Sequence, residues 1–258
     1  MLALVSVAAA HALDEDLAPL SAALDEAGIA HRVVYWDEPF VDWSHYRAVL
    51  IRSPWDYIDK LPEFLAWAAR VSEQSTLLNP LEVITSNTDK HYLEVLAGQG
   101  IHTVPSRFIE PEQHAEDGLH AFLEAFDHAE FVVKPAVGAG SKDAQRHGRE
   151  EVDAALMHIK RLQLKNRSVL LQPYLSRVDE AGETALLYFN GVYSHAIRKG
   201  PLLPKKSWRV CRVKMKWPWP GRSSPPCPPC SAWTVPWPMR ASTCCATKTA
   251  DPVCWSSS

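Results

Sequence analysis

Short apolar runs and amphipathic stretches alternate along the first part of the chain, and the alternation predicts strands separated by helices. The apolar runs are rich in Leu, Val and Ile, as buried strands are, and cover residues 2–8, 31–35 and 48–52. Between the first two runs, leucines recur at helical spacing over residues 13–24, and Gly28 follows as a helix stop. This order predicts a parallel sheet.

The same patterns continue to about residue 199. Helices are expected at residues 61–71, 86–100, 112–126 and 150–162, and strands at residues 104–109, 130–134, 169–172, 184–189 and 192–198. Asn190 and Gly191 join the last two strands, and this dipeptide is the strongest short signal of a tight hairpin. The fold class predicted for this part is α/β.

Composition narrows the class of protein. The chain has 258 residues, of which 47% are hydrophobic and 22% are charged, as in ordinary globular proteins. A net charge of -3 argues against a nucleic-acid partner bound by phosphate neutralisation. No apolar run approaches the ~18 residues of a membrane span. The start, MLALVSVAAAHA, lacks the basic segment of a signal peptide and is expected to be the first strand.

The averages conceal a change of composition near residue 206. Residues 1–206 carry 20 basic and 29 acidic residues and no cysteine, so a cytoplasmic protein is expected. Residues 207–258 carry seven basic residues, one acid (Asp251), all six cysteines and six of the ten tryptophans. The two parts follow different rules of composition.

Two lysines stand where an anion would bind. Lys134 ends an apolar strand and precedes small residues, whose backbone can approach an anion closely; these are Gly138, Ala139, Gly140 and Ser141. Lys90 stands at the start of a predicted helix, where a cation opposes the helix dipole unless an anion is present. The alternatives are a mobile surface loop for the first and a solvent-exposed lysine for the second.

A strand that stops at a proline is a candidate site for a planar heterocycle. It reads LLQPYL, and its end comprises Gln172, Pro173, Tyr174 and Leu175. Its backbone groups and apolar side chains would form the walls of such a site; an ordinary edge strand is the alternative. Glu183 begins the next strand and can accept hydrogen bonds from a sugar, or it is a solvated turn residue.

Charged and aromatic residues follow a further strand end in IRSPWDY. Strand ends of this kind bind ligands in α/β sheets, and the candidates are Arg52, Ser53, Trp55 and Asp56. Arg52 would bind a carboxylate with two hydrogen bonds, or form an ion pair with Asp56. The hairpin ends in Arg198 and Lys199, with an exposed charged strand as the alternative.

Taken in order, these pieces resemble the ATP-grasp superfamily of carboxylate–amine ligases. The matching series is IRSPWDY, LNP, SNTDKHYLEVLAGQGI, FVVKPAVGAGSKD and LLQPYL with GETALLYFNGVYSHAIRKGP, within residues 2–203. The branch that it resembles most includes the cyclo-ligase that closes O-ureido-D-serine to D-cycloserine. The resemblance implies an N-terminal parallel-sheet lobe and two α+β lobes that clasp ATP, the last of them incomplete here.

The resemblance also implies roles for the candidate residues. Lys90 and Lys134 would bind ATP phosphates under the loop that starts at Gly138, and residues 172–175 would form the adenine hinge. Glu183 would bind ribose. Arg198 and Lys199 would be catalytic, near the γ-phosphate or an acyl phosphate. The implied reaction phosphorylates the carboxylate of a small amino-acid-like substrate, and an amine-type nucleophile then displaces the phosphate.

The implied domains follow the same series. They are an N-terminal α/β domain (1–85), a central ATP-grasp subdomain (86–165), the start of a C-terminal subdomain (166–203) and an aberrant tail (204–258). The implied cofactors are ATP and Mg²⁺. Members of the superfamily bind Mg²⁺ through an acidic pair near the C-terminus, but the only acid after Glu183 in this chain is Asp251. No metal ligand is therefore assigned.

The tail has two explanations. Cys227 and Cys230 have the spacing of half a zinc site, but no second pair completes it. A shifted reading frame explains more, because the second frame of residues 238–258 permits both an Arg-x-Asp strand and a Glu-x-Glu pair. We expect the frame to have changed between residues 200 and 205.

A nucleotide-binding protein without ligase activity, or an inactive product without the metal site, is the alternative function.

Overall fold

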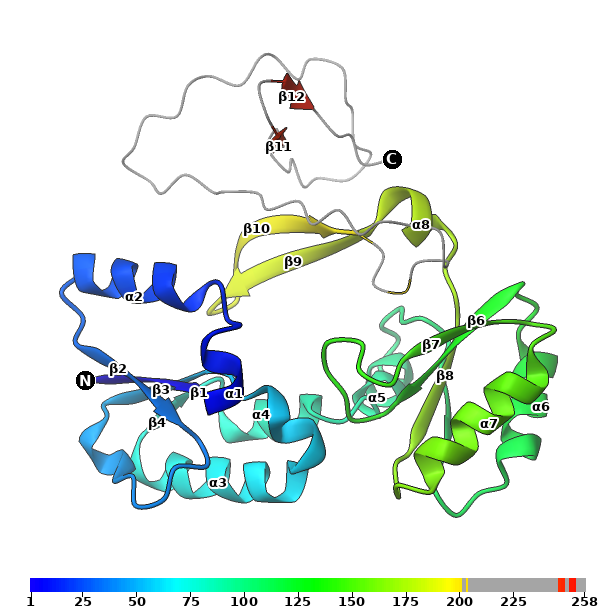
Figure 1. The fold of residues 1–258 in the computed structure, drawn as a ribbon, viewed down its shortest axis with the longest axis horizontal. Helices are drawn as coiled ribbons and strands as arrows, with labels where there is room; N and C mark the ends of the chain where they lie inside the picture. Colours follow the sequence, from blue (N-terminus) through cyan, green and yellow to red (C-terminus); the bar gives the residue numbers. More distant parts are fainter. Residues whose placement is uncertain (201–202, 204–245, 249–250, 254–258) are drawn as a thin grey trace. The chain divides into compact units, whose positions relative to one another are not determined.

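The computed structural model describes residues 1–200, 203, 246–248 and 251–253 (Figure 1). It divides the chain into two compact units, Met1–Tyr174 and Leu175–Ser258. The sequence-based boundaries at residues 85, 165 and 203 stay predictions. The proposed tail lies outside the described residues, apart from the backbone of two short paired strands, β11 (Ala246–Lys248) and β12 (Asp251–Val253).

The first sheet of unit 1 is fully parallel, as the β-α-β pattern predicts. Its strands, in spatial order, are β2 (His31–Tyr35), β1 (Leu2–Ser6), β3 (Ala48–Ser53) and β4 (Thr76–Leu78). The pairing of β1 with β3 shifts register between Val5 and Ser6. The shift brings Ser6 opposite Ser53 at the carboxyl end of the sheet, and their hydroxyl groups are 2.9 Å apart.

Helices cover both faces of this sheet (Figure 1). They are α1 (Ala8–His11), α2 (Leu17–Glu26), α3 (Leu61–Gln74) and α4 (Leu81–Asn87), with short 3-10 turns η1 (Trp43–His45) and η2 (Trp55–Asp59). Gly28 follows α2 with a φ of 68°, which confirms it as the helix stop. The sequence pattern did not predict α1 or α4.

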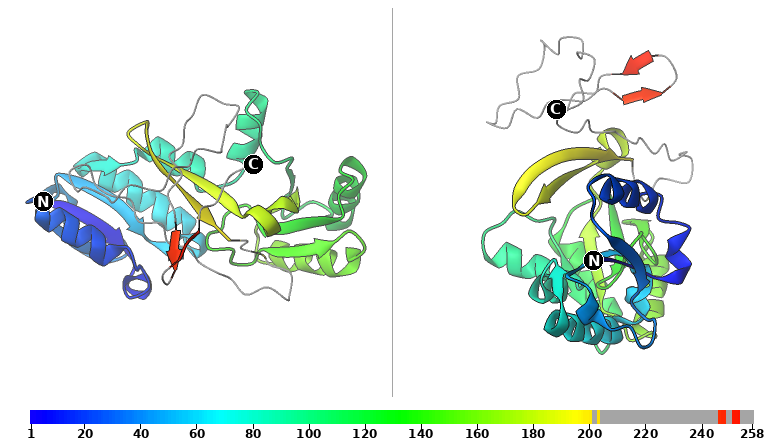
Figure 2. Two further views of the ribbon diagram at one scale, coloured as in Figure 1. Left: turned by 90° about the horizontal axis from the view of Figure 1, so that it is seen from above. Right: turned by 90° about the vertical axis from the view of Figure 1, so that its left-hand side faces the viewer.

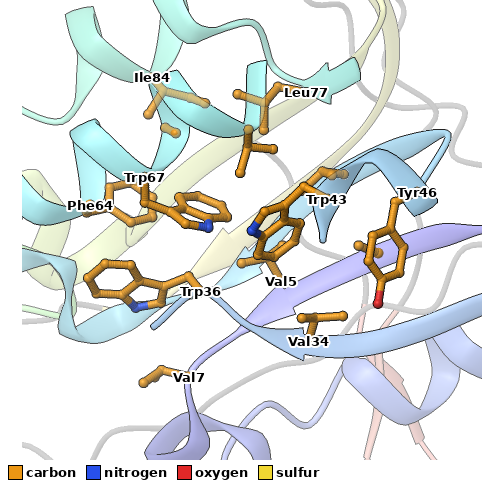
Figure 3. Packing of buried hydrophobic residues seen from close by; sticks show 14 of the residues in the cluster. Val5, Val7, Val34, Trp36, Trp43, Tyr46, Phe64, Trp67, Leu77 and Ile84 are labelled. Atoms are coloured by element: carbon orange, nitrogen blue, oxygen red, sulfur yellow. The ribbon is translucent and has the colours of Figure 1, made fainter. Parts of the chain in front are cut away.

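An aromatic cluster fills the space between α3 and the sheet (Figure 3). Trp36, Trp43, Phe64 and Trp67 are each 2–6% exposed. The Trp67 ring stacks on Phe64 at 5.3 Å between centroids and meets Trp43 edge-on at 5.4 Å. Because each such side chain buries a large apolar area, this cluster dominates the stability of the N-terminal sheet.

A second sheet in unit 1 is antiparallel. Its strands, in spatial order, are β5 (Arg107–Ile109), β8 (Val169–Pro173), β6 (Glu130–Pro135) and β7 (Gln145–Gly148). Its helices are α5 (Tyr92–Gly98), α6 (Ala115–Ala125) and α7 (Val152–Gln163). The sequence did not predict β7, because the letters QRHG carry no apolar alternation. His147 is nevertheless buried, and its neighbour Arg146 is only partly buried.

Unit 2 begins with a short helix and a hairpin. These are α8 (Arg177–Ala181), β9 (Glu183–Phe189) and β10 (Val192–Lys199), and the two strands form a long twisted ribbon (Figure 2). Asn190 and Gly191 have φ values of 50° and 76°. Both values belong to the two-residue turn that the dipeptide predicts, so the hairpin is confirmed.

Close packing between α6 and β5 gives a test of the fold. A methyl group on Gly118 would lie 2.6 Å from Cδ1 and 2.7 Å from Cγ1 of Ile109, which is fully buried. Gly118→Ala should lower the free energy of unfolding by about 1–2 kcal/mol, because overpacking outweighs the ~1 kcal/mol gain in helix propensity. Calorimetry would measure the change.

Gly98 provides the matched control for this substitution. It lies in α5, and a methyl group there would meet nothing within 4 Å. Gly98→Ala should therefore leave stability unchanged or raise it by up to ~1 kcal/mol. Equal melting temperatures for the two variants would contradict the packing of α6 against Ile109.

Candidate functional site

Side chains of the second sheet separate onto two faces. Phe131 and Val133 of β6 belong to the core formed with α6 and α7. Since neighbouring residues on a strand point to opposite faces, Val132 and Lys134 lie on the face away from these helices. Gln172 of β8 pairs with Val132 in register and lies on the same face.

Lys90 is held against the loop that follows β6. It lies in the turn between α4 and α5 rather than in the first turn of a helix, so the predicted conflict with the helix dipole does not arise. Its ammonium group donates to the carbonyl oxygens of Ala136 and Gly138, both at 2.9 Å. An ammonium group has three protons, so one more remains for an anion.

The pKa of Lys90 is lowered to about 8. Burial is the main cause, and the nearby charges of Lys134 and Arg167 lower it further, while Asp89 acts in the opposite direction. Lys90 is half-buried, so the alternative of a solvent-exposed lysine is wrong. The structure thus brings the two predicted phosphate lysines to the same loop.

The loop itself is held at both ends by an arginine that the sequence did not single out. Arg167 donates to the carbonyl oxygen of Val137 at 2.7 Å and to the carboxylate of Asp143 at 2.9 Å. Gly140 and Ser141 have φ values near 60°, a region that favours glycine. A methyl group on Gly138 would lie 3.1 Å from Pro135 and 3.8 Å from the Lys90 ammonium. The absence of a side chain at Gly138 thus relieves a tight contact with Pro135, while its carbonyl oxygen reaches Lys90.

Two buried histidines, His147 and His158, form a hydrogen-bonded chain that ends at the same loop. His158 Nε2 lies 3.1 Å from the carbonyl oxygen of Asp143, and its Nδ1 lies 3.4 Å from Nε2 of His147. Because a carbonyl only accepts, His158 must donate from Nε2. Burial, followed by the charges of Arg161 and His147, lowers the pKa of His158 to about 4. Nδ1 of the neutral ring then accepts a hydrogen bond from Nε2 of His147, whose pKa is also lowered by burial.

The loop also reaches the segment predicted to bind substrate. Lys142 donates to the carboxylate of Asp59 at 2.7 Å, and this hydrogen bond lowers the pKa of Asp59. Asp59 ends η2, the short turn that contains Trp55 and Asp56. The candidate phosphate loop and the candidate substrate segment therefore touch through this ion pair.

The predicted adenine hinge lies in an interior strand, so the alternative of an edge strand is wrong. β8 has β5 on one side and β6 on the other. β5 pairs only as far as Leu171, however, and the strand runs on beyond it. The side chain of Gln172 donates to Ser106 Oγ at 2.8 Å. One face of the Tyr174 ring is covered by the guanidinium of Arg146, 3.5 Å from the ring centroid.

The candidate substrate residues have partners that the sequence did not predict. Arg52 pairs with Asp14 at 2.9 Å and with Asp16 at 3.4 Å, so the alternative of an ion pair between Arg52 and Asp56 is wrong. Asp56 instead accepts from Trp36 Nε1 at 2.8 Å and from Lys60 at 3.0 Å. Asp14 precedes α2 in the chain, and the tertiary fold places it beside Arg52 near the end of β3.

The remaining two substrate candidates differ in accessibility. Ser53 is fully buried and bonded to Ser6, whereas Trp55 is 45% exposed. Nε of Arg52 and Oδ2 of Asp14 are buried and have no hydrogen-bond partner among the described residues. This end of the sheet therefore retains polar groups that hydrogen bonding has not yet satisfied.

Leu175, Glu183, Arg198 and Lys199 belong to unit 2 and are described within it alone. Glu183 pairs with Lys199 across the hairpin, and Thr184 pairs with Arg198. Gly182, with a φ of 70°, precedes this pairing, and a methyl group on it would collide with the carbonyl oxygen of Lys199. The hairpin thus brings the predicted ribose ligand and the predicted catalytic cations to one end of the ribbon.

Magnesium ligands do not assemble in the part of the chain that the structure describes. No group of three or more His, Cys, Asp or Glu side chains is suited to a metal ion there.

A cavity of about 500 Å³ beside α3 is lined by Trp36, Phe40, Trp67 and Arg70, among others, and by none of the candidate residues. None of the helices described is long and apolar enough to cross a membrane.

Comparison with known proteins adds independent findings. A family model described as the N-terminal domain of the D-cycloserine synthetase DcsG matches residues 2–79. The cycloserine biosynthesis protein DcsG of Streptomyces lavendulae is 42% identical over 204 residues, which make up 79% of this chain and 68% of that protein.

Solved structures agree with these matches. The crystal structure of D-cycloserine synthetase DcsG superposes with a TM-score of 0.74 at 42% identity, over 79% of this chain and 69% of that one. D-alanyl-alanine synthetase A from Vibrio cholerae superposes with a TM-score of 0.55 at 12% identity, over 82% and 72%. A RimK domain ATP-grasp protein from Sphaerobacter thermophilus superposes with a TM-score of 0.54 at 16% identity, over 72% of this chain and 67% of that one. These superpositions confirm the predicted fold.

The lowered pKa of Lys90 predicts that this side chain takes up a proton from solution when a phosphate ligand binds. With a pKa of about 8, roughly half of the amine is neutral at pH 8, and a bound polyphosphate favours the charged form. ATP binding at pH 8 should therefore take up as much as about half a proton per site. Calorimetry in two buffers with different ionisation enthalpies measures this number.

Two variants check the assignment to this lysine. Lys90→Met should abolish the proton uptake, and Lys160→Met, an equivalent change on an exposed face of α7, should keep it. Identical binding heats in both buffers for the unaltered chain would contradict the prediction.

The buried histidine pair predicts a loss of stability in acid. The unfolded chain binds a proton at His158 near pH 6.5, whereas the folded chain does so only near pH 4, so stability falls as the pH drops through this window. The loss amounts to as much as about 3 kcal/mol. Melting temperatures between pH 4 and 7 should fall less in His158→Gln, while the exposed control His120→Gln should follow the unaltered chain. Identical profiles for all three would exclude a neutral buried His158.

Proposed function

Since this chain belongs to the D-cycloserine synthetase DcsG family, we propose that it carries the ATP-binding and substrate-binding parts of an ATP-dependent ligase. The substrate is a small amino-acid-like acid of the O-ureido-D-serine type. ATP phosphorylates its carboxylate to an acyl phosphate, and an amine-type nucleophile then displaces phosphate. In a cyclo-ligase, the nucleophile belongs to the same molecule.

One observation carries the proposal. Lys90 is half-buried beside two other cations, and its pKa stays lowered although two backbone carbonyls and the nearby charge of Asp89 favour the protonated form. A buried charge without a counter-ion costs several kcal/mol. A bound triphosphate would supply the missing negative charge, so the arrangement is explained by a ligand of this kind.

The proposed roles are those that the family resemblance implies, taken unit by unit. In unit 1, Lys90 and Lys134 bind phosphates beneath the loop of residues 138–141, and the end of β8 holds the adenine. Arg52, with Ser53, Trp55 and Asp56 nearby in the chain, lies at a strand end where α/β proteins bind substrates. In unit 2, Glu183 binds ribose, and Arg198 and Lys199 stabilise negative charge on the transferring phosphoryl group.

Phosphoryl transfer from ATP ordinarily uses Mg²⁺, and here the available donors do not fit it. Hard cations require several oxygen ligands. The described residues offer no such cluster, and Asp251 is the only acid after Glu183. We therefore assign no step to a metal in this chain, and a protein that binds ATP without turnover is the second candidate function.

The shifted-frame hypothesis turns this disagreement into a test. Two proteins are compared, the chain as given and one encoded with the second reading frame restored after about codon 205. Both should bind ATP in calorimetry, and Lys134→Ala should weaken binding in both. Only the restored protein should release ADP in the presence of Mg²⁺ and O-ureido-D-serine, at least about 100-fold faster than the chain as given.

Each outcome separates the candidates. Equal ADP release by both proteins would show that the second frame is not needed. ATP binding without ADP release by either would favour the binding protein. A failure of both to bind ATP would overturn the site itself.

A further inference from the structure

His91, the residue after Lys90, lies between two carboxylates from different parts of the fold. Its Nδ1 is 2.6 Å from Asp89 Oδ1, and its Nε2 is 3.0 Å from Glu110 Oε1. The backbone N–H of His91 also donates to Asp89 at 3.0 Å. The ring stacks on Phe108 of β5, with 3.9 Å between the ring centroids. The orientation of the ring is thus determined on three sides.

These contacts require a doubly protonated ring. A carboxylate only accepts hydrogen bonds, so both ring nitrogens of His91 must donate, and only the imidazolium does this. Burial opposes the charge, but the hydrogen bonds and charges of Asp89 and Glu110 outweigh it and raise the pKa of His91. His91 is therefore a cation that connects two anions.

The second oxygen of Glu110 continues the network towards the loop. Glu110 Oε2 accepts from Ser168 Oγ at 2.5 Å. The carbonyl oxygen of Ser168 accepts from the backbone N–H of Ala136 at 2.8 Å, and the carbonyl oxygen of Ala136 accepts from the backbone N–H of Lys90 at 3.1 Å. Since Lys90 and His91 are neighbours in the chain, these bonds close a ring.

The ring contains the carbonyl that holds the Lys90 side chain. Ala136 O accepts from the Lys90 ammonium at 2.9 Å as well as from its backbone N–H. The backbone carbonyl of Glu110 is tied to α7, because it accepts from Gln163 at 2.7 Å. The ring thereby joins the start of α5, the end of β5, the start of β8 and the loop after β6.

We propose that His91 and Glu110 are positioning residues, which hold Lys90 against the phosphate loop through this closed ring of hydrogen bonds. Neither side chain needs to touch the nucleotide. Their role is to keep in place an ammonium group that repulsion from Lys134 and Arg167 would otherwise drive towards solvent. The inference rests on the proposed function, because it assumes that Lys90 binds a phosphate.

The test compares a ligand that has phosphates with one that lacks them. His91→Gln removes the cation and can satisfy only one of the two carboxylates. It should raise the Kd for ATP about 10-fold and leave the Kd for adenosine within about twofold, because adenosine lacks the phosphates that Lys90 contacts. Calorimetry measures the first value and ligand-observed NMR measures the second. A general loss of structure would weaken both ligands.

Three further variants sharpen this test. Glu110→Gln should reproduce the selective loss, and the double variant His91→Gln/Glu110→Gln should be no worse than either single variant, because both changes open the same ring. His120→Gln, on an exposed face of α6, should change neither Kd. An unchanged Kd for ATP in His91→Gln, or equal weakening of ATP and adenosine, would overturn the proposal.

A measurement without nucleotide separates this proposal from the proposed function. NMR of the lysine side chains in the unliganded protein reports the pKa of Lys90. His91→Gln should raise it towards the ordinary value of 10.5, because the ammonium group is no longer held in place and becomes more solvated. A raised pKa in a protein that does not bind ATP would support the ring and contradict the proposed function. An unchanged pKa would contradict the ring.

Discussion

A positive charge that is half-buried between backbone carbonyls is the constraint around which the candidate site is arranged. Lys90 lies between Ala136 and Gly138, and the nearby cations Lys134 and Arg167 make its charged form less favourable. Coulomb repulsion between like charges is strong where water is partly excluded. The structure meets this cost with hydrogen bonds to carbonyl dipoles, and it leaves one ammonium proton for a ligand of opposite charge.

Loop geometry follows from the same constraint. The loop after β6 brings two carbonyl oxygens to one ammonium group, and left-handed backbone angles follow at Gly140 and Ser141. Arg167 holds both ends of the loop, and His158 supports the carbonyl of Asp143 from the helical side of the sheet. A neutral buried histidine suits this position, because a positive charge there would be repelled by Arg161.

The chain combines the proposed phosphate-binding residues of unit 1 with a C-terminal part that is poor in acidic residues. The features of unit 1 are those expected of a relative that is 42% identical to a cycloserine biosynthesis protein. The composition changes abruptly near residue 206, and after Glu183 only one acid remains. The hypothesis of a changed reading frame would account for both observations, since such a change alters every residue after one point and none before it.

Much of the fold could be predicted from the sequence, because periodicity and turn chemistry are local properties. The parallel sheet, Gly28 as a helix stop and the hairpin at Asn190 and Gly191 were all predicted. Long-range pairings were not. A short polar strand such as β7 carries no apolar signal, and it forms because Glu130 and its neighbours in β6 provide a partner.

At the site, residue types and their order along the chain predict which side chains can bind a phosphate, whereas the contacts of each side chain depend on the tertiary structure. Lys90, Lys134 and the small-residue loop are recognisable because their order and residue types are written along the chain. Three sets of contacts join residues that lie 19 to 58 positions apart in the chain: the pair of Arg52 and Asp14, the bonds of Arg167 to the loop, and the ring through His91. No local pattern encodes such contacts, because they arise only when separate strands and helices pack together.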